Sequence, residues 1–234
     1  MLLNENNRPI LQNIIELDVT VASGTNIYGS GNKYIINGET SPSLNFIVGN
    51  TYVFDLSGVD QYMHPFQISA IEDGIHNAGD AYTQGVTRTS DKLTIEVTAD
   101  TPTLYYYCVR HPGMGADTKT GFPSVDENAS PDTVIYYAEA TDPDGDTLTY
   151  EVSGTDASYV EIDEDNGEVR LLSSADYETK DSYTFDVTAS DGELSDTKTV
   201  TVNVTDIEDT TPNEAPVITS YGSYLFVQEN IPTD

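Results

Sequence analysis

The chain has 234 residues and a large excess of acid, with 40 Asp and Glu against 9 Lys and Arg, for a formal net charge of −31. Such a surface repels nucleic acid and anionic membranes and attracts cations, so metal binding is the first function to consider. A purely solubilising role in a salty medium is the alternative explanation of the charge. Aliphatic and aromatic residues, 16 Tyr among them, are plentiful enough for a core, which excludes an acidic disordered chain.

Cys108 is the only cysteine of the sequence, so no intrachain disulfide can form. A secreted chain without disulfides needs another reinforcement, and bound calcium would supply one. No apolar run is long enough to cross a bilayer, and the polar start from Met1 to Pro9 is not a signal peptide. Export would then use a signal outside this chain, or the protein would be released on a particle. The third alternative is that the sequence is part of a longer polypeptide.

Short segments of alternating polarity, separated by Gly, Asn, Asp and Pro, run through the whole chain, and none shows a sustained helical period. This pattern predicts an all-β protein built from sandwiches. The clearest predicted strands, in chain order, are 17–21, 51–56, 93–97, 104–107, 183–189 and 199–204.

The composition changes near residues 116–124, because all three histidines and the cysteine lie before this stretch and acidic clusters follow it. A second break falls at 209–216, where two prolines and polar residues indicate an extended linker. We therefore expect five segments, which are an N-terminal extension at 1–16, a first domain at 17–118, a second domain at 119–209, a linker at 210–216 and the beginning of a further domain at 217–234.

Six acidic motifs follow one another between Phe122 and Pro216. They are Asp126-Glu127-Asn128, Ala140-Thr-Asp142-Pro-Asp144-Gly-Asp146, Val160-Glu-Ile162-Asp163, Ala175-Asp176-Tyr177-Glu178, Ala189-Ser-Asp191-Gly192 and Asp206-Ile-Glu-Asp209. In their order and over this length they resemble a bacterial cadherin-like repeat, which implies an Ig-like sandwich that binds calcium. The opening pattern recurs at Val227-Gln-Glu229-Asn230, which indicates the start of a second repeat.

Calcium takes six to eight oxygen ligands, several of them from carboxylates. The resemblance implies that the ligands at the pole facing the next repeat are Glu127, Asp176, Glu178, Asp206 and Asp209, together with Glu229 of that repeat. Asp142, Asp144 and Asp191 match positions that face a preceding linker, and the upstream domain provides no acidic linker motif. At Asp209-Thr210 the usual Asp-Asn pair lacks its Asn, which would weaken the site.

Two acidic stretches have simpler explanations than a metal loop. Asp142-Pro-Asp144-Gly-Asp146 starts like an EF-hand, but its glycine is fourth instead of sixth and Ser153 stands in place of the terminal Glu. We reject that motif. Asp165-Asn-Gly-Glu168 lies between alternating segments, where Asn-Gly predicts a tight hairpin turn.

A thiol, an imidazole and a thioether fall within seven positions in Cys108-Val-Arg-His111-Pro-Gly-Met114, after a predicted strand. Blue-copper sites use one Cys and two His in a plane with a weak axial Met. With a second imidazole from His64, residues 17–118 resemble a cupredoxin-like Greek-key sandwich, which implies a type 1 copper at His64, Cys108, His111 and Met114. The alternative is a domain that keeps this fold and loop without using a metal, and His76 has no matching role.

Proteins of marine bacteria and their phages carry similar Tyr-Tyr-Tyr-Cys…His…Gly-Met-Gly segments attached to repeat domains. The resemblance implies a structural or adhesive protein that is extracellular, on a cell surface or on a virion, with neighbouring repeats, copies of itself, a surface receptor or a glycan as partners. The alternative function is copper-dependent electron transfer. We expect no enzyme, since the sequence contains no Ser-His-Asp arrangement, phosphate loop or zinc motif.

Overall fold

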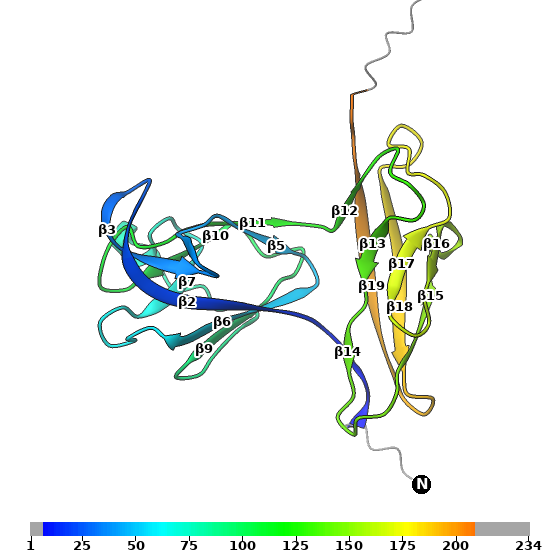
Figure 1. The fold of residues 1–234 in the computed structure, drawn as a ribbon, viewed down its shortest axis with the longest axis horizontal. Coiled ribbons are helices and arrows are strands. Elements are labelled where there is room, and N and C mark those ends of the chain that lie inside the picture. Colours follow the sequence, from blue (N-terminus) through cyan, green and yellow to red (C-terminus); the bar gives the residue numbers. More distant parts are fainter. Residues whose placement is uncertain (1–6, 209–234) are drawn as a thin grey trace, which may run out of the picture.

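The computed structural model describes residues 7–208, and the long elements of this part are all β-strands. They form two bodies, which we call the head (residues 13–121) and the repeat (residues 123–208) (Figure 1). The predicted all-β class is confirmed. The expected linker at 210–216 and the expected further repeat at 217–234 lie outside the described residues.

Two sheets make the head. The six-stranded sheet has the order β4 (Glu39–Thr40), β3 (Gly29–Ile36), β2 (Asn13–Asn26), β6 (Asn50–Gly58), β9 (Lys92–Glu96) and β8 (Val86–Arg88). The four-stranded sheet has the order β5 (Leu44–Ile47), β11 (Ala116–Gly121), β10 (Leu104–Cys108) and β7 (Phe66–Ser69). The pairs β2–β6 and β5–β11 are parallel, and the other pairs of the two sheets are antiparallel.

The core of the head lies between these sheets and is rich in aromatic rings. In β10 the alternation predicted from the sequence turns Leu104, Tyr106 and Cys108 inward. The rings of Tyr34 and Phe66 meet edge to face at 5.0 Å, a favourable arrangement of two aromatic quadrupoles. Cys108 thus lies at the end of a buried strand face, where backbone and packing fix its position.

The repeat has two facing sheets and a short strand pair. One sheet has the order β12 (Ser124–Asp126), β19 (Ser195–Thr205), β18 (Ser182–Ser190) and β15 (Thr149–Ser153). The other has the order β13 (Val134–Tyr137), β17 (Glu168–Leu171) and β16 (Val160–Ile162). The short pair joins β1 (Ile10–Leu11) to β14 (Ala140–Thr141).

The long strand β18 shows why this part of the chain folds as a sandwich. Its burial alternates strictly, with Tyr183, Phe185, Val187 and Ala189 inside the core. Alternating burial is the pattern of an antiparallel strand with one solvated face. Residues 160–162 and 168–171 form the predicted hairpin, although the connection runs over 163–167 and is longer than a two-residue turn.

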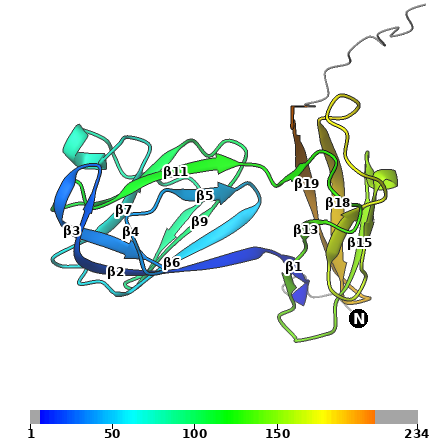
Figure 2. The same cartoon turned by 45° about the horizontal axis from the view of Figure 1, so that its top comes forward.

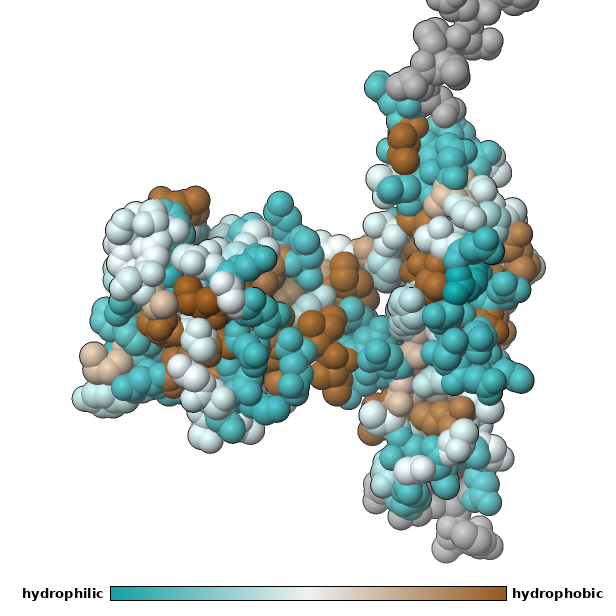
Figure 3. Space-filling model, viewed as in Figure 1, coloured by the Kyte–Doolittle hydropathy of each residue, from teal (hydrophilic) through white to brown (hydrophobic). Residues whose placement is uncertain are grey.

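The head projects sideways from the long axis of the repeat, as Figures 1 and 2 both show. Its last strand, β11, continues to Gly121, beyond the expected boundary at 118. At the junction, Lys198 donates a hydrogen bond to the carbonyl of Gly49 across a crevice of about 190 Å³. The visible face of the repeat is mostly hydrophilic, with hydrophobic residues beside the junction (Figure 3). In the range 7–208, no helix combines the length and the apolar character that a membrane span needs.

Candidate metal sites

Three carboxylates meet at the pole of the repeat where β19 ends. Oxygens of Glu127, Glu178 and Asp206 lie within 4.8 Å of one another. Glu127 is only 4% exposed, whereas the other two side chains are exposed. Since carboxylates at this spacing repel one another and can share one cation, the cluster has the chemistry of a calcium site.

Glu127 holds its place through backbone donors from two separate segments. Its Oε1 accepts from the amide of Ile207 at 2.7 Å, and its Oε2 accepts from the amide of Tyr177 at 3.3 Å. Its own amide donates to the carbonyl of Thr205 at 3.1 Å. These bonds tie three segments of the chain together at one carboxylate, which a buried acidic group needs in order to be tolerated.

Other members of the predicted calcium set have different surroundings. Asp176 accepts from the amide and the hydroxyl of Thr179, at 3.0 and 2.8 Å, and so closes a local turn. It does not belong to the carboxylate cluster found among residues 7–208. Asp209 and Glu229 lie outside the described residues.

Asp142, Asp144 and Asp191 lie at the opposite pole, beside β14 and the end of β18. One oxygen of Asp142 accepts from the amides of residues 144 and 146, while its Oδ2 is buried with no hydrogen-bond partner. Asp144 accepts from the side-chain amide of Asn7 at 2.5 Å. Amides of residues 193 and 194 donate to Asp191, and these bonds lower the pKa of its carboxyl group.

The head brings together the three strongest copper ligands predicted from the sequence. Ligand atoms of His64, Cys108 and His111 all lie within 4.8 Å of one another. The Cys108 sulfur is 3.5 Å from Nδ1 of His111, and the two imidazole rings are 4.7 Å apart. One thiol and two imidazoles in this arrangement suit copper, and the same set also suits zinc.

The electrostatics of the cluster favour neutral imidazole at His64. Burial lowers the pKa of His64, the neighbouring His111 lowers it further, and Asp60 opposes the change. Its Nδ1 is buried and has no hydrogen-bond partner. A buried ring nitrogen without a hydrogen-bond partner, on an imidazole held neutral, fits a metal ligand, because a metal would satisfy the unpaired nitrogen.

The loop after Cys108 is also anchored at Met114, a residue that is 1% exposed. Its carbonyl accepts from the Tyr34 amide at 3.0 Å and from the Ser41 hydroxyl at 2.9 Å. The amide of Gly113, with φ at +69°, donates to both oxygens of Asp73, at 2.9 and 3.0 Å. The backbone of this loop is therefore held at both Gly113 and Met114.

Two residues beside the cluster were not predicted. Nε2 of His76 lies 2.8 Å from the carbonyl oxygen of Cys108, although no role for His76 was expected from the sequence. The hydroxyl of Tyr34 donates to the carbonyl of His64 at 2.9 Å. Both side chains contact backbone atoms of the candidate ligand residues, and both lie far from the ligand loop in the sequence. Residue type was therefore the only signal in the sequence that could have pointed to them.

Comparison with known proteins identifies a family match in the second body. Residues 123–205 match the family model of the Cadherin domain. A stretch of 79 residues is 39% identical to Cadherin-related family member 2 of Mus musculus, covering 34% of this chain and 6% of that protein. A stretch of 82 residues is 39% identical to Protocadherin-15 of Homo sapiens, covering 34% of this chain and 4% of that protein.

A longer stretch of 121 residues is 32% identical to Cadherin-related family member 1 of Xenopus laevis and covers 47% of this chain and 14% of that protein. The chain thus spans a small part of the length of these relatives. Among solved structures, human Protocadherin-24 EC1-2 is 30% identical with a TM-score of 0.35, over 37% of this chain and 41% of that one. On these sequence matches, residues 123–205 are similar to a Cadherin domain.

Proposed function

We propose that this protein is a structural or adhesive component of an extracellular, cellular or virion surface, and that calcium stiffens its cadherin-like repeat. The observation that carries this proposal is the cluster of Glu127, Glu178 and Asp206 at one pole, with the first two inside the segment that matches the Cadherin domain and Asp206 directly after it. Its partners would be neighbouring repeats, further copies of this chain, or a surface receptor or glycan.

The physical argument is that three clustered carboxylates repel one another until a cation joins them. Calcium at this pole would connect the ends of β12 and β19 and the loop that carries Glu178, which fixes the direction in which the chain leaves the repeat. The remaining oxygens of a six- to eight-coordinate ion would come from Asp209, from the next repeat or from water. The net charge of −31 further raises the local cation concentration.

Calcium titration followed by the melting temperature tests this proposal. We expect calcium to raise the melting temperature and EDTA to reverse the effect. Glu127→Gln should remove most of the response, because it neutralises the central ligand. Glu161→Gln is the matched control, because Glu161 is an exposed carboxylate outside the cluster. Equal melting in calcium and EDTA would exclude the proposal.

We also propose, as a second candidate function, that the head binds copper and transfers electrons. The observation in its favour is that His64, from a distant part of the chain, converges within 4.8 Å with Cys108 and His111 of one loop, and that its Nδ1 is left unpartnered. A thiolate and a thioether stabilise Cu(I), and imidazoles suit both oxidation states, so the set would support one-electron chemistry. Met114 would be the weak axial ligand.

Visible absorption after adding Cu(II) tests the second candidate. An intense blue band that is lost in Cys108→Ser would support a type 1 site. His76→Gln is the control variant, because the His76 ring contacts the backbone carbonyl of Cys108 and is not in the ligand cluster. A colourless protein with Cu(II) would mean that the head is a scaffold, and the adhesive function would stand alone.

A further inference from the structure

One strand that pairs with the repeat precedes the head in the sequence. Ile10 and Leu11 of β1 pair antiparallel with Thr141 and Ala140 of β14. The head begins at Asn13, only two residues after Leu11, and ends at Gly121. The whole head therefore lies, in the sequence, between two strands of the repeat, β1 and β12.

Leu11 is part of the hydrophobic core of the repeat. Its side chain is 7% exposed and packs in the cluster of buried residues that includes Val187 and Val202. No other buried member of that cluster precedes Val125 within residues 7–208. A buried leucine contributes to the stability of the core that surrounds it, so the repeat depends on this residue even though 113 positions separate Leu11 from the beginning of β12.

Asp196 of β19 holds β1 from the side. Its Oδ2 accepts from the amide of Leu11 at 3.0 Å, and its Oδ1 pairs with the guanidinium of Arg8 at 2.8 Å. The side chain of Asp196 is 18% exposed, so this ion pair is partly shielded from water. Charge-assisted hydrogen bonds to one carboxylate fix the position of β1 against β19.

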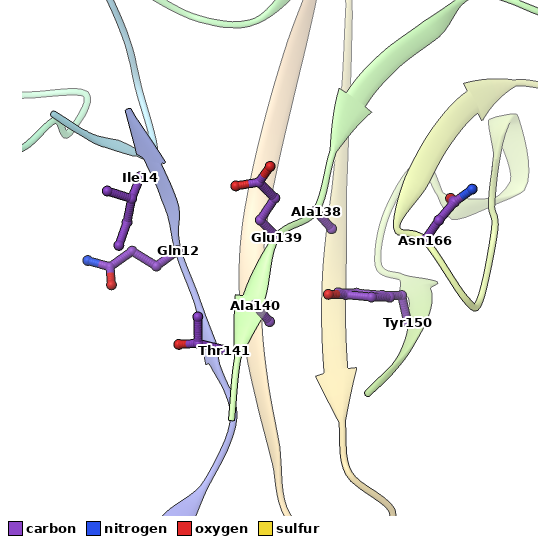
Figure 4. A pocket seen from close by; sticks show the side chains of 8 residues that line it. All are labelled: Gln12, Ile14, Ala138, Glu139, Ala140, Thr141, Tyr150 and Asn166. Atoms are coloured by element: carbon purple, nitrogen blue, oxygen red, sulfur yellow. The ribbon is translucent and has the colours of Figure 1, made fainter. Parts of the chain in front are cut away.

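The pairing continues beyond β1 toward the head. The amide of Gln12 donates to the carbonyl of Glu139 at 2.8 Å, and the Asn13 side chain bonds the carbonyl of Tyr137 at 2.9 Å and the amide of Glu139 at 3.1 Å. Figure 4 shows Gln12 and Ile14 on one strand beside Glu139, Ala140 and Thr141 on the other, around a pocket of about 320 Å³. The chain enters the head without a free linker.

A second crossing lies on the return path. β11 leads through Phe122 and Pro123 into β12, and the carbonyl of Pro123 accepts from the amide of Asn203 at 2.8 Å. Together with the contact between Lys198 and Gly49, two crossings fix the head to one flank of the repeat. Two separated attachments resist rotation in a way that one linker cannot.

We infer that residues 7–12 are the first segment of the repeat and that the head is a domain inserted into it, held as a rigid side branch by β1. This inference is independent of calcium and copper, because it depends on backbone pairing, Leu11 and Asp196. In this arrangement the head covers neither pole of the repeat. The head would therefore extend the protein sideways and not along the direction of a repeat array (Figure 1).

Hydrogen exchange of the full chain, followed by mass spectrometry, tests the inference with Leu11→Ala. We expect exchange to rise by about tenfold or more in β14 and β18 of the repeat, while β6 and β9 of the head keep their protection. Leu56→Ala is the matched control, because Leu56 is 1% exposed in the head core and should loosen β6 and β9. Increased exchange confined to the head in Leu11→Ala would overturn the inference.

A cross-link tests the same pairing without weakening the core. Ile10→Cys and Thr141→Cys, combined in a Cys108→Ser background, place two thiols at partner positions of β1 and β14. We expect a disulfide on mild oxidation and a melting temperature that rises by several degrees and falls again on reduction. Absence of the disulfide in protein that is folded by circular dichroism would also overturn the inference.

Discussion

The hydroxyl of Tyr34, a fully buried residue, donates a hydrogen bond of 2.9 Å to the backbone carbonyl of His64. The same hydroxyl interacts with the Cys108 side chain, which adds to the effect of burial in raising the pKa of Tyr34. One phenol thus bridges two residues of the candidate copper cluster that are 44 positions apart. The position of His64 depends on a residue that would not itself bind the metal.

We predict that Tyr34→Phe lowers the free energy of unfolding by about 1–2 kcal/mol, because the substitution leaves a buried carbonyl without its donor. Thermal or urea unfolding measures this loss. Tyr106→Phe is the control, since its equally buried hydroxyl donates to Pro42, away from the cluster, at 2.8 Å. If copper binds, only Tyr34→Phe should shift the visible band, and identical spectra of both variants would contradict the bridging role.

Asp73 restrains the loop that carries Met114, because both of its oxygens accept from the Gly113 amide. We predict that Asp73→Ala loosens this loop and exposes the buried Cys108 more often. The rate at which a thiol reagent modifies Cys108 in the native protein should rise by about tenfold. Asp100→Ala, at an exposed carboxylate of the head, should leave the rate unchanged. Equal rates in both variants would show that Asp73 does not control the loop.

Gly167 ends the connection between β16 and β17 with φ at +74°. A Cβ atom there would lie 2.3 Å from the carbonyl oxygen of Ala138, so Gly167→Ala adds a backbone clash to the strain of a left-handed residue. We predict a loss of about 3 kcal/mol in urea unfolding. Gly145→Ala, where φ is +80° and the space is open, isolates the strain and should cost about 1 kcal/mol. Similar losses in both variants would mean that the clash is relieved.

Tyr136 makes the repeat sensitive to alkali. The pKa of Tyr136 is raised to about 12, chiefly by burial; the Asn13 side chain opposes the change and the charge of Glu139 adds to it. Because the pKa of Tyr136 in the folded protein lies above its unfolded value near 10, its contribution to the free energy of unfolding is complete below pH 10. This contribution is lost as the pH rises toward 12. We predict a steeper fall of stability between pH 10 and 12 in the wild type than in Tyr136→Phe, as measured by urea unfolding. Parallel pH profiles would contradict the assignment.

Much of the fold could be predicted from local pattern. The alternating segments at 51–56, 104–107 and 183–189 are the strands β6, β10 and β18, because alternation records which face of a strand is buried. His64, Cys108 and His111 also converge as predicted, since a short loop after a strand fixes two of them. Long-range geometry was harder to predict. The sequence does not reveal that Asp176 closes its own turn with Thr179 while Glu178 joins the cluster.

The strand β1 was beyond sequence analysis for a different reason. Two residues are too few to show a period, and Ile10 and Leu11 stand between the polar start of the chain and the polar pair Gln12-Asn13. Its partner in β14 is 129 positions away from Leu11, so no local signal links them. The position of such a strand is determined by its partner strand and by the part of the core that its side chain fills.

Within the described part of the chain, β14 pairs with no strand except β1. A chain clipped between Arg8 and Asn13 would therefore uncover an open strand edge and the apolar slot that Leu11 fills. Exposed edges of this kind recruit strands from other molecules and promote aggregation. Residues 8–12 thus cover this edge, and we expect an intact amino-terminal segment to keep the protein monodisperse during storage and handling.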